Sequence, residues 1–185
     1  MDFKTLADQY RNELLDNVLP FWLEHSQDLE FGGYFSCLDR EGKVFDTDKF
    51  IWLQGREVWM FSMLYNKVEK RQEWLDCAVQ GGEFLKKYGH DGNYNWYFSL
   101  DRSGRPLVEP YNIFSYTFAT MAFGQLSLAT GNQEYADIAK KTFEIILSKV
   151  DNPKGKWNKL HPGTRNLKNF ALPMILCNLA LEIEH

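Results

Sequence analysis

Apolar residues recur at helical spacing in six segments of the chain, and each segment predicts a helix. The first runs from 6 to 18, and Pro20 is expected to break or kink it. Gly89 is expected to end the third helix in a left-handed conformation. The other five predicted helices span 53–67, 73–88, 112–129, 134–150 and 167–185. This pattern is typical of an all-α protein.

The connections and the apolar faces of these helices predict a layered arrangement. Two short β-hairpins are expected between helices, over 31–49 and 93–108, because turn residues there separate short runs of strand formers. The helix at 112–129 is apolar nearly all round, whereas the helix at 134–150 is amphipathic. Buried inner helices that alternate with half-exposed outer helices fit three αα-hairpins in two layers.

The chain also repeats itself with a period of about 60 residues, as stacked structural repeats do. Segment 34–43 resembles 97–105, and 72–78 resembles 133–139. Each repeat buries its apolar face against a neighbour. Three repeats fill 1–185 as a single domain, and a closed ring of six would need roughly twice this length. No Gly or Pro stop signal follows the last apolar helix, so we expect half of such a ring.

Composition changes this picture little but excludes several classes of function. Hydrophobic residues make up 44% of the chain, charged residues 25%, and the net charge is −4, as in an ordinary globular protein. The sequence has no basic cluster of the kind that binds nucleic acid, and none of its apolar runs is long enough to span a membrane. Three widely spaced cysteines predict reduced thiols in a cytoplasmic protein and no metal site. The high aromatic content, 16%, fits either a core or a binding cleft.

One cation stands in an unusual position at the start of a buried helix. Arg56 follows Trp52 by one helical turn and precedes Trp59. A guanidinium among apolar side chains is costly unless it is paired or faces a polar cavity. Two interpretations stay open: an ion pair with Glu57 or Glu109, or a donor to an oxyanion in a cleft. We expect Arg56 to face a central cavity beside Trp52 and not the solvent.

Three segments, 50–78, 109–132 and 154–182, point to a known family. Their most specific motifs are Trp-Leu-Gln-Gly-Arg at 52–56 and Pro-Gly-Thr-Arg at 162–165. Along essentially its whole length the chain resembles the N-acylglucosamine 2-epimerase family, also called renin-binding proteins. Members of that family are (α/α)6 toroids. The resemblance therefore implies the N-terminal half of an (α/α)6 toroid, with short β-hairpins in its loops.

The resemblance implies a carbohydrate isomerase that inverts C2 of an amino sugar, converting N-acetylglucosamine to N-acetylmannosamine. This chemistry needs a base, an acid on the other face of the sugar and a cation for the enolate oxygen, but no metal or redox cofactor. The family's essential arginine corresponds to Arg56, which is the expected catalytic residue. Trp52 and Tyr111 match residues that line the substrate pocket, although either residue alone is ordinarily explained by packing.

The chain departs from the family in its acid–base groups. The family's two catalytic histidines lie in the C-terminal half, and they match none of the four histidines here: His25, His90, His161 and His185. His90 and His161 are expected in solvated loops. Asn169 matches an asparagine of the family and is a further expected substrate contact. In related sugar isomerases and cellobiose epimerases, a histidine follows this asparagine by about one helical turn. In this chain Pro173 stands at that position. These differences favour the N-acylglucosamine branch and predict that the chain alone is inactive.

The loop 154–165 collects cations, among them Lys156, Lys159 and Arg165. Several members of the family are activated by ATP, so one interpretation of this loop is a contact with nucleotide phosphate. A solvated charged loop is the other interpretation, and the Gly-Lys-Ser/Thr of a phosphate-binding loop is missing. ATP is therefore expected only as an activator, and no cofactor is required.

Three functions remain open on the sequence. The first is half of a sugar 2-epimerase, completed by a second toroid half or by another copy of the chain. The second is a glycoside hydrolase, which needs two facing carboxylates; Asp39, Asp101 and Glu109 are available, but they sit in or beside hairpin turns. The third is a non-catalytic module that binds a sugar or a protein through its open edge.

Overall fold

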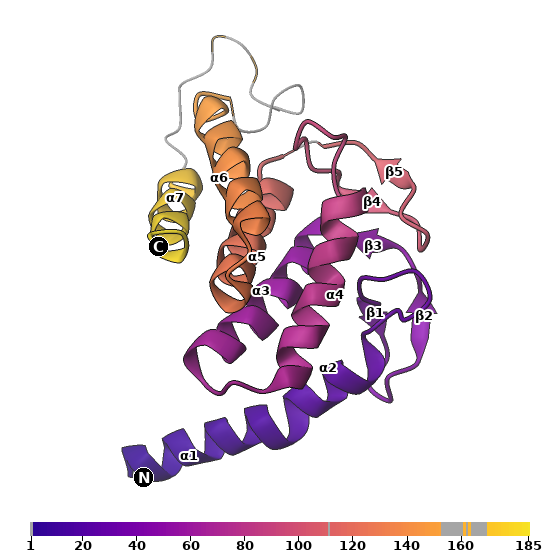
Figure 1. Ribbon diagram of the computed structural model, residues 1–185, viewed down its shortest axis with the longest axis vertical. Coiled ribbons are helices and arrows are strands. Elements are labelled where there is room, and N and C mark those ends of the chain that lie inside the picture. The colour runs from indigo at the N-terminus through magenta and orange to yellow at the C-terminus, as the bar shows by residue number, and fades with distance from the viewer. Residues whose placement is uncertain (1, 111, 153–160, 162, 164–169) are drawn as a thin grey trace.

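The computed structural model describes residues 2–110, 112–152, 161, 163 and 170–185, and most of these are helical (Figure 1). In chain order the helices are α1 (Phe3–Glu13), the π-helical η1 (Leu14–Val18), α2 (Leu19–His25), α3 (Ile51–Lys67), α4 (Gln72–Tyr88), α5 (Phe114–Thr130), α6 (Gln133–Ser148) and α7 (Ala171–Glu182). The strands are β1 (Cys37–Leu38), β2 (Val44–Asp46), β3 (Lys49–Phe50), β4 (Ser99–Leu100) and β5 (Pro106–Val108). None of the helices in these ranges is long and apolar enough to cross a membrane.

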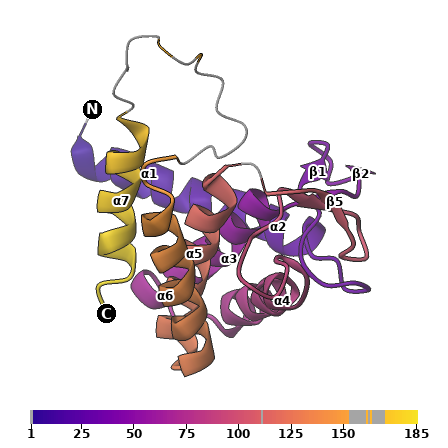
Figure 2. The ribbon, with the colours of Figure 1, turned by 90° about the horizontal axis from the view of Figure 1, so that it is seen from above.

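The helices form two layers, as the alternation of apolar and amphipathic segments predicts. The middle of α5, from Ala119 to Ser127, is buried on every side, and the helix contacts α3, α6 and α7. α4 packs against α3, and α6 packs against α5, each with one exposed face. Seen from above, α7 lies at one side of this array and the hairpins lie at the other (Figure 2). α3, α5 and α7 are therefore the inner helices, and α4 and α6 are outer helices.

The two β-hairpins share one turn geometry, in agreement with the internal repeat of the sequence. In the first, the Asp39 N–H donates to the carbonyl four residues ahead and the Gly42 N–H donates back to Asp39 O, both at 3.0 Å. Asp101 and Gly104 make the same two bonds in the second hairpin, at 2.8 and 3.0 Å. Gly42 and Gly104 have φ of 84° and 94°, where glycine is favoured. Each aspartate also accepts N–H groups of its own turn, so both carboxylates stabilise their turns.

A buried ion network joins the segments that precede α3 and α5. Lys49 in β3 is fully buried, and its Nζ lies 2.9 Å from Asp28 Oδ2. Arg102 in the second hairpin turn adds two bonds to the same carboxylate, Nε to Oδ2 at 2.9 Å and Nη2 to Oδ1 at 3.1 Å. Burial raises the pKa of Asp28, but Arg102 and Lys49 more than offset burial and lower that pKa to about 2. Asp28 is therefore an anion that fixes these segments relative to each other.

The N-terminal helix runs on through Pro20, so of the predicted break or kink the break is wrong. Residues 14–18 form a π-helical turn, after which the Leu19 N–H donates to Leu14 O. Pro20 then occupies the first turn of α2, where a missing N–H costs little. The wider turn before the proline thus admits it without ending the helix.

α4 ends at Gly89 as predicted, but the predicted left-handed conformation is wrong. Gly89 has φ −69° and ψ −14°, in the right-handed helical region. A Cβ there would lie 2.6 Å from Leu85 O and 2.7 Å from the Trp96 ring. Close packing against the segment that follows, and not a positive φ, is the reason for a glycine at this position.

Candidate functional site

The Trp-Leu-Gln-Gly-Arg motif forms the first turns of α3, and neighbouring segments fix where this helix begins. β3 leads directly into α3 and pairs with β4, Lys49 opposite Leu100. The first N–H of the helix, that of Ile51, donates to Phe98 O at 3.0 Å. The second hairpin segment therefore sets the start of α3.

Gln54 and Gly55 set the position of α3 against its surroundings. Gln54 is fully buried, and its side-chain amide accepts from the Tyr34 N–H and donates to Tyr34 O, both at 2.8 Å. A Cβ at Gly55 would lie 2.9 Å from the backbone carbonyl of Phe118. Because glycine has no Cβ, α3 and α5 can come this close.

Arg56 projects from α3 toward α5. Its guanidinium carbon lies 5.8 Å from the centre of the Trp52 ring and 5.2 Å from that of Phe118, within range for cation–π attraction. The residue is exposed, so the expectation that it is shielded from solvent is wrong. Within the described ranges Arg56 forms no ion pair, and Glu57 contacts Ser26 instead. No described carboxylate therefore takes up the donors of the guanidinium.

A cavity of about 490 Å³ opens between the start of α3 and the start of α5. Trp52 and Phe118, the two aromatic residues beside Arg56, form two of its walls, with ring centres 6.2 Å apart. Among the described residues, the cavity is also lined by Phe98, Asn112, Phe114 and Ser115. Aromatic walls with a few polar groups are typical of small-molecule sites. This cavity with its adjoining arginine is the candidate functional site.

Sequence reasoning missed the three phenylalanines of this site, Phe98, Phe114 and Phe118. Phe114 and Phe118 lie one turn apart on α5, and the Phe114 N–H donates to Asn112 Oδ1 at 2.9 Å just before that helix begins. Their i, i+4 spacing was a signal that they share a helix face. Nothing local in the sequence indicates that this face meets Arg56.

Five predicted site residues lie outside the described residues: Tyr111, Lys156, Lys159, Arg165 and Asn169. Pro173 is described, and it is exposed in the first turn of α7. Among the side chains that the structure places, no three His, Cys, Asp or Glu residues are grouped so as to hold a metal ion. The ATP contact and the remaining substrate contacts stay predictions.

No histidine is found among the cavity residues that the structure describes. His90, expected to be solvated, is half-buried: its ring stacks on Tyr94 at 4.7 Å and meets Trp96 edge-on at 4.8 Å. Burial lowers the pKa of His90, so this imidazole is a neutral packing group at neutral pH. His185 Nε2 lies 3.3 Å from Ser127 Oγ, near the far ends of α5 and α7. The described side chains around the cavity therefore contain no histidine acid–base pair.

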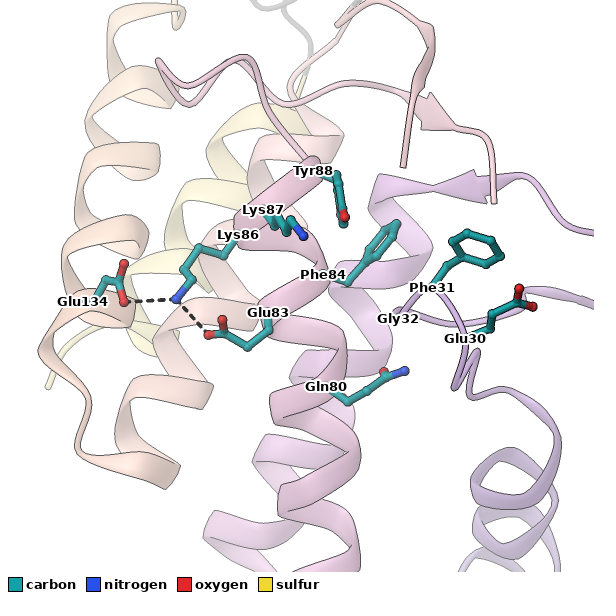
Figure 3. Close-up of a pocket in the computed structure, with 10 residues that line it drawn as sticks. All are labelled: Glu30, Phe31, Gly32, Gln80, Glu83, Phe84, Lys86, Lys87, Tyr88 and Glu134. Atoms are coloured by element: carbon teal, nitrogen blue, oxygen red, sulfur yellow. Dashed lines mark hydrogen bonds and ion pairs between the residues drawn. The ribbon is translucent and has the colours of Figure 1, made fainter. Parts of the chain in front are cut away.

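A second cavity, of about 640 Å³, lies between α4, the segment 30–32 and the start of α6 (Figure 3). One of its two lysines is already paired, since Lys86 Nζ lies 2.9 Å from Glu83 and 3.1 Å from Glu134. It shares no lining residue with the cavity beside Arg56. It is therefore separate from the candidate site.

Known proteins resemble this chain in sequence. The family model described as N-acylglucosamine 2-epimerase (GlcNAc 2-epimerase) matches residues 33–185. The N-acylglucosamine 2-epimerase of Bos taurus is 41% identical over 174 residues, which are 91% of this chain and 41% of that protein. The cellobiose 2-epimerase of Dictyoglomus turgidum is 29% identical over 167 residues, which are 85% of this chain and 42% of that protein.

The fold is shared as well. The structure of cellobiose 2-epimerase from Bacillus thermoamylovorans B4167 superposes with a TM-score of 0.81 and 24% identity, covering 98% of this chain and 50% of that one. The likeness confirms the predicted fold: three αα-hairpins that form half of an (α/α)6 toroid, with short β-hairpins in the loops. The chain spans about half the length of the relatives it matches.

Proposed function

Because the chain belongs to the N-acylglucosamine 2-epimerase family, we propose that it supplies the Arg56 side of a carbohydrate-isomerase site. The observation that carries this proposal is an arginine without an ion pair among the described residues, next to two aromatic residues that line a cavity of about 490 Å³. Such a volume is within the usual range for small-molecule sites. N-acetylglucosamine is the proposed substrate, since identity is 41% to a relative named for N-acylglucosamine and 29% to one named for cellobiose.

Arg56 has a specific part in this chemistry. Removal of the C2 proton from an open-chain 2-acetamido sugar leaves an enolate, and negative charge develops on the oxygen of C1. A donor that already points at this oxygen stabilises the charge without reorganisation. Trp52 and Phe118 flank the guanidinium and hold it in place. Proton removal and return to the opposite face of C2 require an acid–base pair in addition.

The acid–base pair is proposed to come from a partner, either a second toroid half or another copy of the chain. The α7 region exposes three large apolar side chains, Phe170 by 77%, Met174 by 58% and Leu181 by 70%. Burial of such side chains stabilises by roughly 1.5–3 kcal/mol each, so a partner that covers them would bind. The chain alone is proposed to be inactive. The completed protein is proposed to act in the cytoplasm, with ATP as an activator and no required cofactor.

The two other functions have less support. A glycoside hydrolase needs two facing carboxylates, one of them with a raised pKa. Asp39 and Asp101 are instead held by N–H groups of their own turns. The Arg105 N–H, the Ser103 hydroxyl and the Arg105 side chain hold the pKa of Asp101 below its usual range. A non-catalytic module would use the same cavity for binding, and the activity of the completed protein separates it from an isomerase.

The test is to compare the chain alone with a completed protein. The chain is fused ahead of the C-terminal half of the bovine relative, and N-acetylmannosamine formed from N-acetylglucosamine is measured for the chain, the bovine half and the fusion. We expect product from the fusion and from neither half alone. Product from the chain alone would contradict the need for a partner. A folded fusion that binds the sugar without converting it would favour the binding module, and release of reducing sugar from glycans would favour the hydrolase.

A further inference from the structure

Two polar side chains line the cavity beside Arg56, and each has a hydrogen-bonding group without a partner among the described residues. They are Asn112 and Ser115, at the start of α5. The other described lining residues are aromatic: Trp52, Phe98, Phe114 and Phe118. Asn112 Oδ1 accepts the Phe114 N–H at 2.9 Å, and this bond sets which end of the amide is the oxygen. The amide nitrogen of Asn112 is therefore a donor, and no described residue accepts from it.

Ser115 differs from the other hydroxyl-bearing residues of its helix. It is only 3% exposed. The remaining serine and threonine residues of α5 each donate to a backbone carbonyl three or four residues earlier: Thr117, Thr120, Ser127 and Thr130. Within the part of the chain that the structure describes, the Ser115 hydroxyl has neither an acceptor nor a donor. A buried hydroxyl without a partner destabilises the fold, so this position in a cavity wall fits a ligand that supplies the missing partner.

The described lining has the composition that an acetamido group requires. The carbonyl oxygen of that group accepts, its N–H donates and its methyl group is apolar. The Asn112 amide can donate to the carbonyl oxygen, the Ser115 hydroxyl can accept from the N–H, and the aromatic rings can cover the methyl group. A row of sugar hydroxyls would need more polar partners than these two side chains provide. We propose that Asn112 and Ser115 bind the acetamido group of a 2-acetamido sugar and select it over a sugar with a hydroxyl at C2.

This assignment agrees with the place of Arg56. The acetamido group lies on C2 of the sugar, and the oxygen that becomes negative lies on the neighbouring C1. Trp52 and Phe118 line the cavity, and their ring centres also lie 5.8 and 5.2 Å from the guanidinium carbon of Arg56. A sugar held in the cavity by its acetamido group therefore brings its C1 oxygen close to the rings that the guanidinium contacts. The inference takes its sugar from the proposed function, but it concerns binding and not conversion.

The test measures binding of two sugars that cannot react. N-acetylglucosaminitol and glucitol are open-chain sugar alcohols that differ only at C2, where the first has an acetamido group and the second a hydroxyl. The indole N–H signal of Trp52, in the cavity wall, reports the binding of each to the chain. We expect N-acetylglucosaminitol to bind more tightly by about 10-fold or more, as the sum of two hydrogen bonds implies. Asn112→Asp still accepts the Phe114 N–H but has no donor, and Ser115→Ala removes only the hydroxyl.

Each of these two variants should lower the preference for the acetamido sugar by about 3- to 10-fold and leave the binding of glucitol unchanged. Asn93→Asp and Ser148→Ala make the same changes at exposed positions and should keep the preference. The proposal is overturned if the unaltered chain does not prefer N-acetylglucosaminitol, or if either cavity variant keeps the preference in full. A fusion that converts N-acetylglucosamine would still support the isomerase in that case. A fusion without activity, in contrast, leaves a measured preference as evidence for acetamido recognition.

Discussion

Gly55 of α3 meets Phe118 of α5 so closely that a Cβ on the glycine would lie 2.9 Å from the Phe118 carbonyl. The next residue, Arg56, places its guanidinium 5.2 Å from the centre of the same phenyl ring. The glycine and the arginine of the motif therefore act together. The glycine sets the separation of two inner helices, and that separation brings the arginine over the ring.

Gly55→Ala is expected to destabilise the chain, although alanine is the better helix former by about 1 kcal/mol. The added methyl group forces α3 and α5 apart, which typically costs about 1–3 kcal/mol. Urea unfolding measures the change in free energy, with Thr5→Ala on the exposed α1 as the control. A variant as stable as the unaltered chain would show that the two helices are not in close contact.

Lys49→Met is expected to lower the free energy of unfolding by about 3–5 kcal/mol, because it removes one partner of a buried ion pair. The Asp28 carboxylate would keep Arg102 but lose the fully buried ammonium. The control is Arg40→Gln, which breaks an exposed pair with Glu41 and should cost under about 1 kcal/mol. Equal effects of the two substitutions in urea unfolding would contradict the role given to the buried network.

Two carboxyl groups are expected to give stability an opposite dependence on pH. Glu57 has a pKa raised by burial from 4.5 to about 8, so the folded state holds its proton longer than the unfolded chain does. Its contribution is fully present below pH 4.5 and is lost as the pH rises toward 8. Asp28 has a pKa lowered from 3.8 to about 2, so its contribution is present above pH 3.8 and is lost as the pH falls toward 2.

Urea unfolding at a series of pH values checks both statements. In Glu57→Gln, the free energy of unfolding should no longer fall between mildly acidic and mildly alkaline pH. Asp28→Asn should be less stable overall, but its free energy of unfolding should fall less in acid than that of the unaltered chain. If Glu57→Gln leaves the alkaline slope unchanged, another group is responsible for it.

The chain is expected to associate, because α7 exposes the apolar side chains of Met174 and Leu181. Light scattering at micromolar concentration should report a species larger than the 21.7 kDa of one chain. Leu181→Glu should shift it toward that mass, whereas Phe45→Ser, on the exposed first hairpin, should not. A stable, well-dispersed monomer of the unaltered chain would mean that this surface does not require a partner.

The helices were predictable because their apolar residues follow the helical period, and the hairpins because of Gly42 and Gly104 in matching turns. The site was only half predictable. Arg56 and Trp52 belong to one motif, one turn apart, but Phe118 reaches them through the packing of α5 on α3, which no local pattern records. The sequence predicts a solvated His90 because its neighbours are turn residues. Turn residues do not show what a loop packs against, and in the structure the His90 ring stacks on Tyr94.

The substitution of Arg56 in the completed protein tests the central claim most directly. In the fusion described above, the turnover of N-acetylglucosamine is compared for the unaltered protein, Arg56→Ala and the control Arg40→Ala. If Arg56 stabilises the enolate, Arg56→Ala should lower turnover by about 10²-fold or more, as the loss of an oxyanion donor does, while Arg40→Ala leaves turnover unchanged. Unchanged turnover in a folded Arg56→Ala fusion would contradict the claim and make this arginine a structural residue.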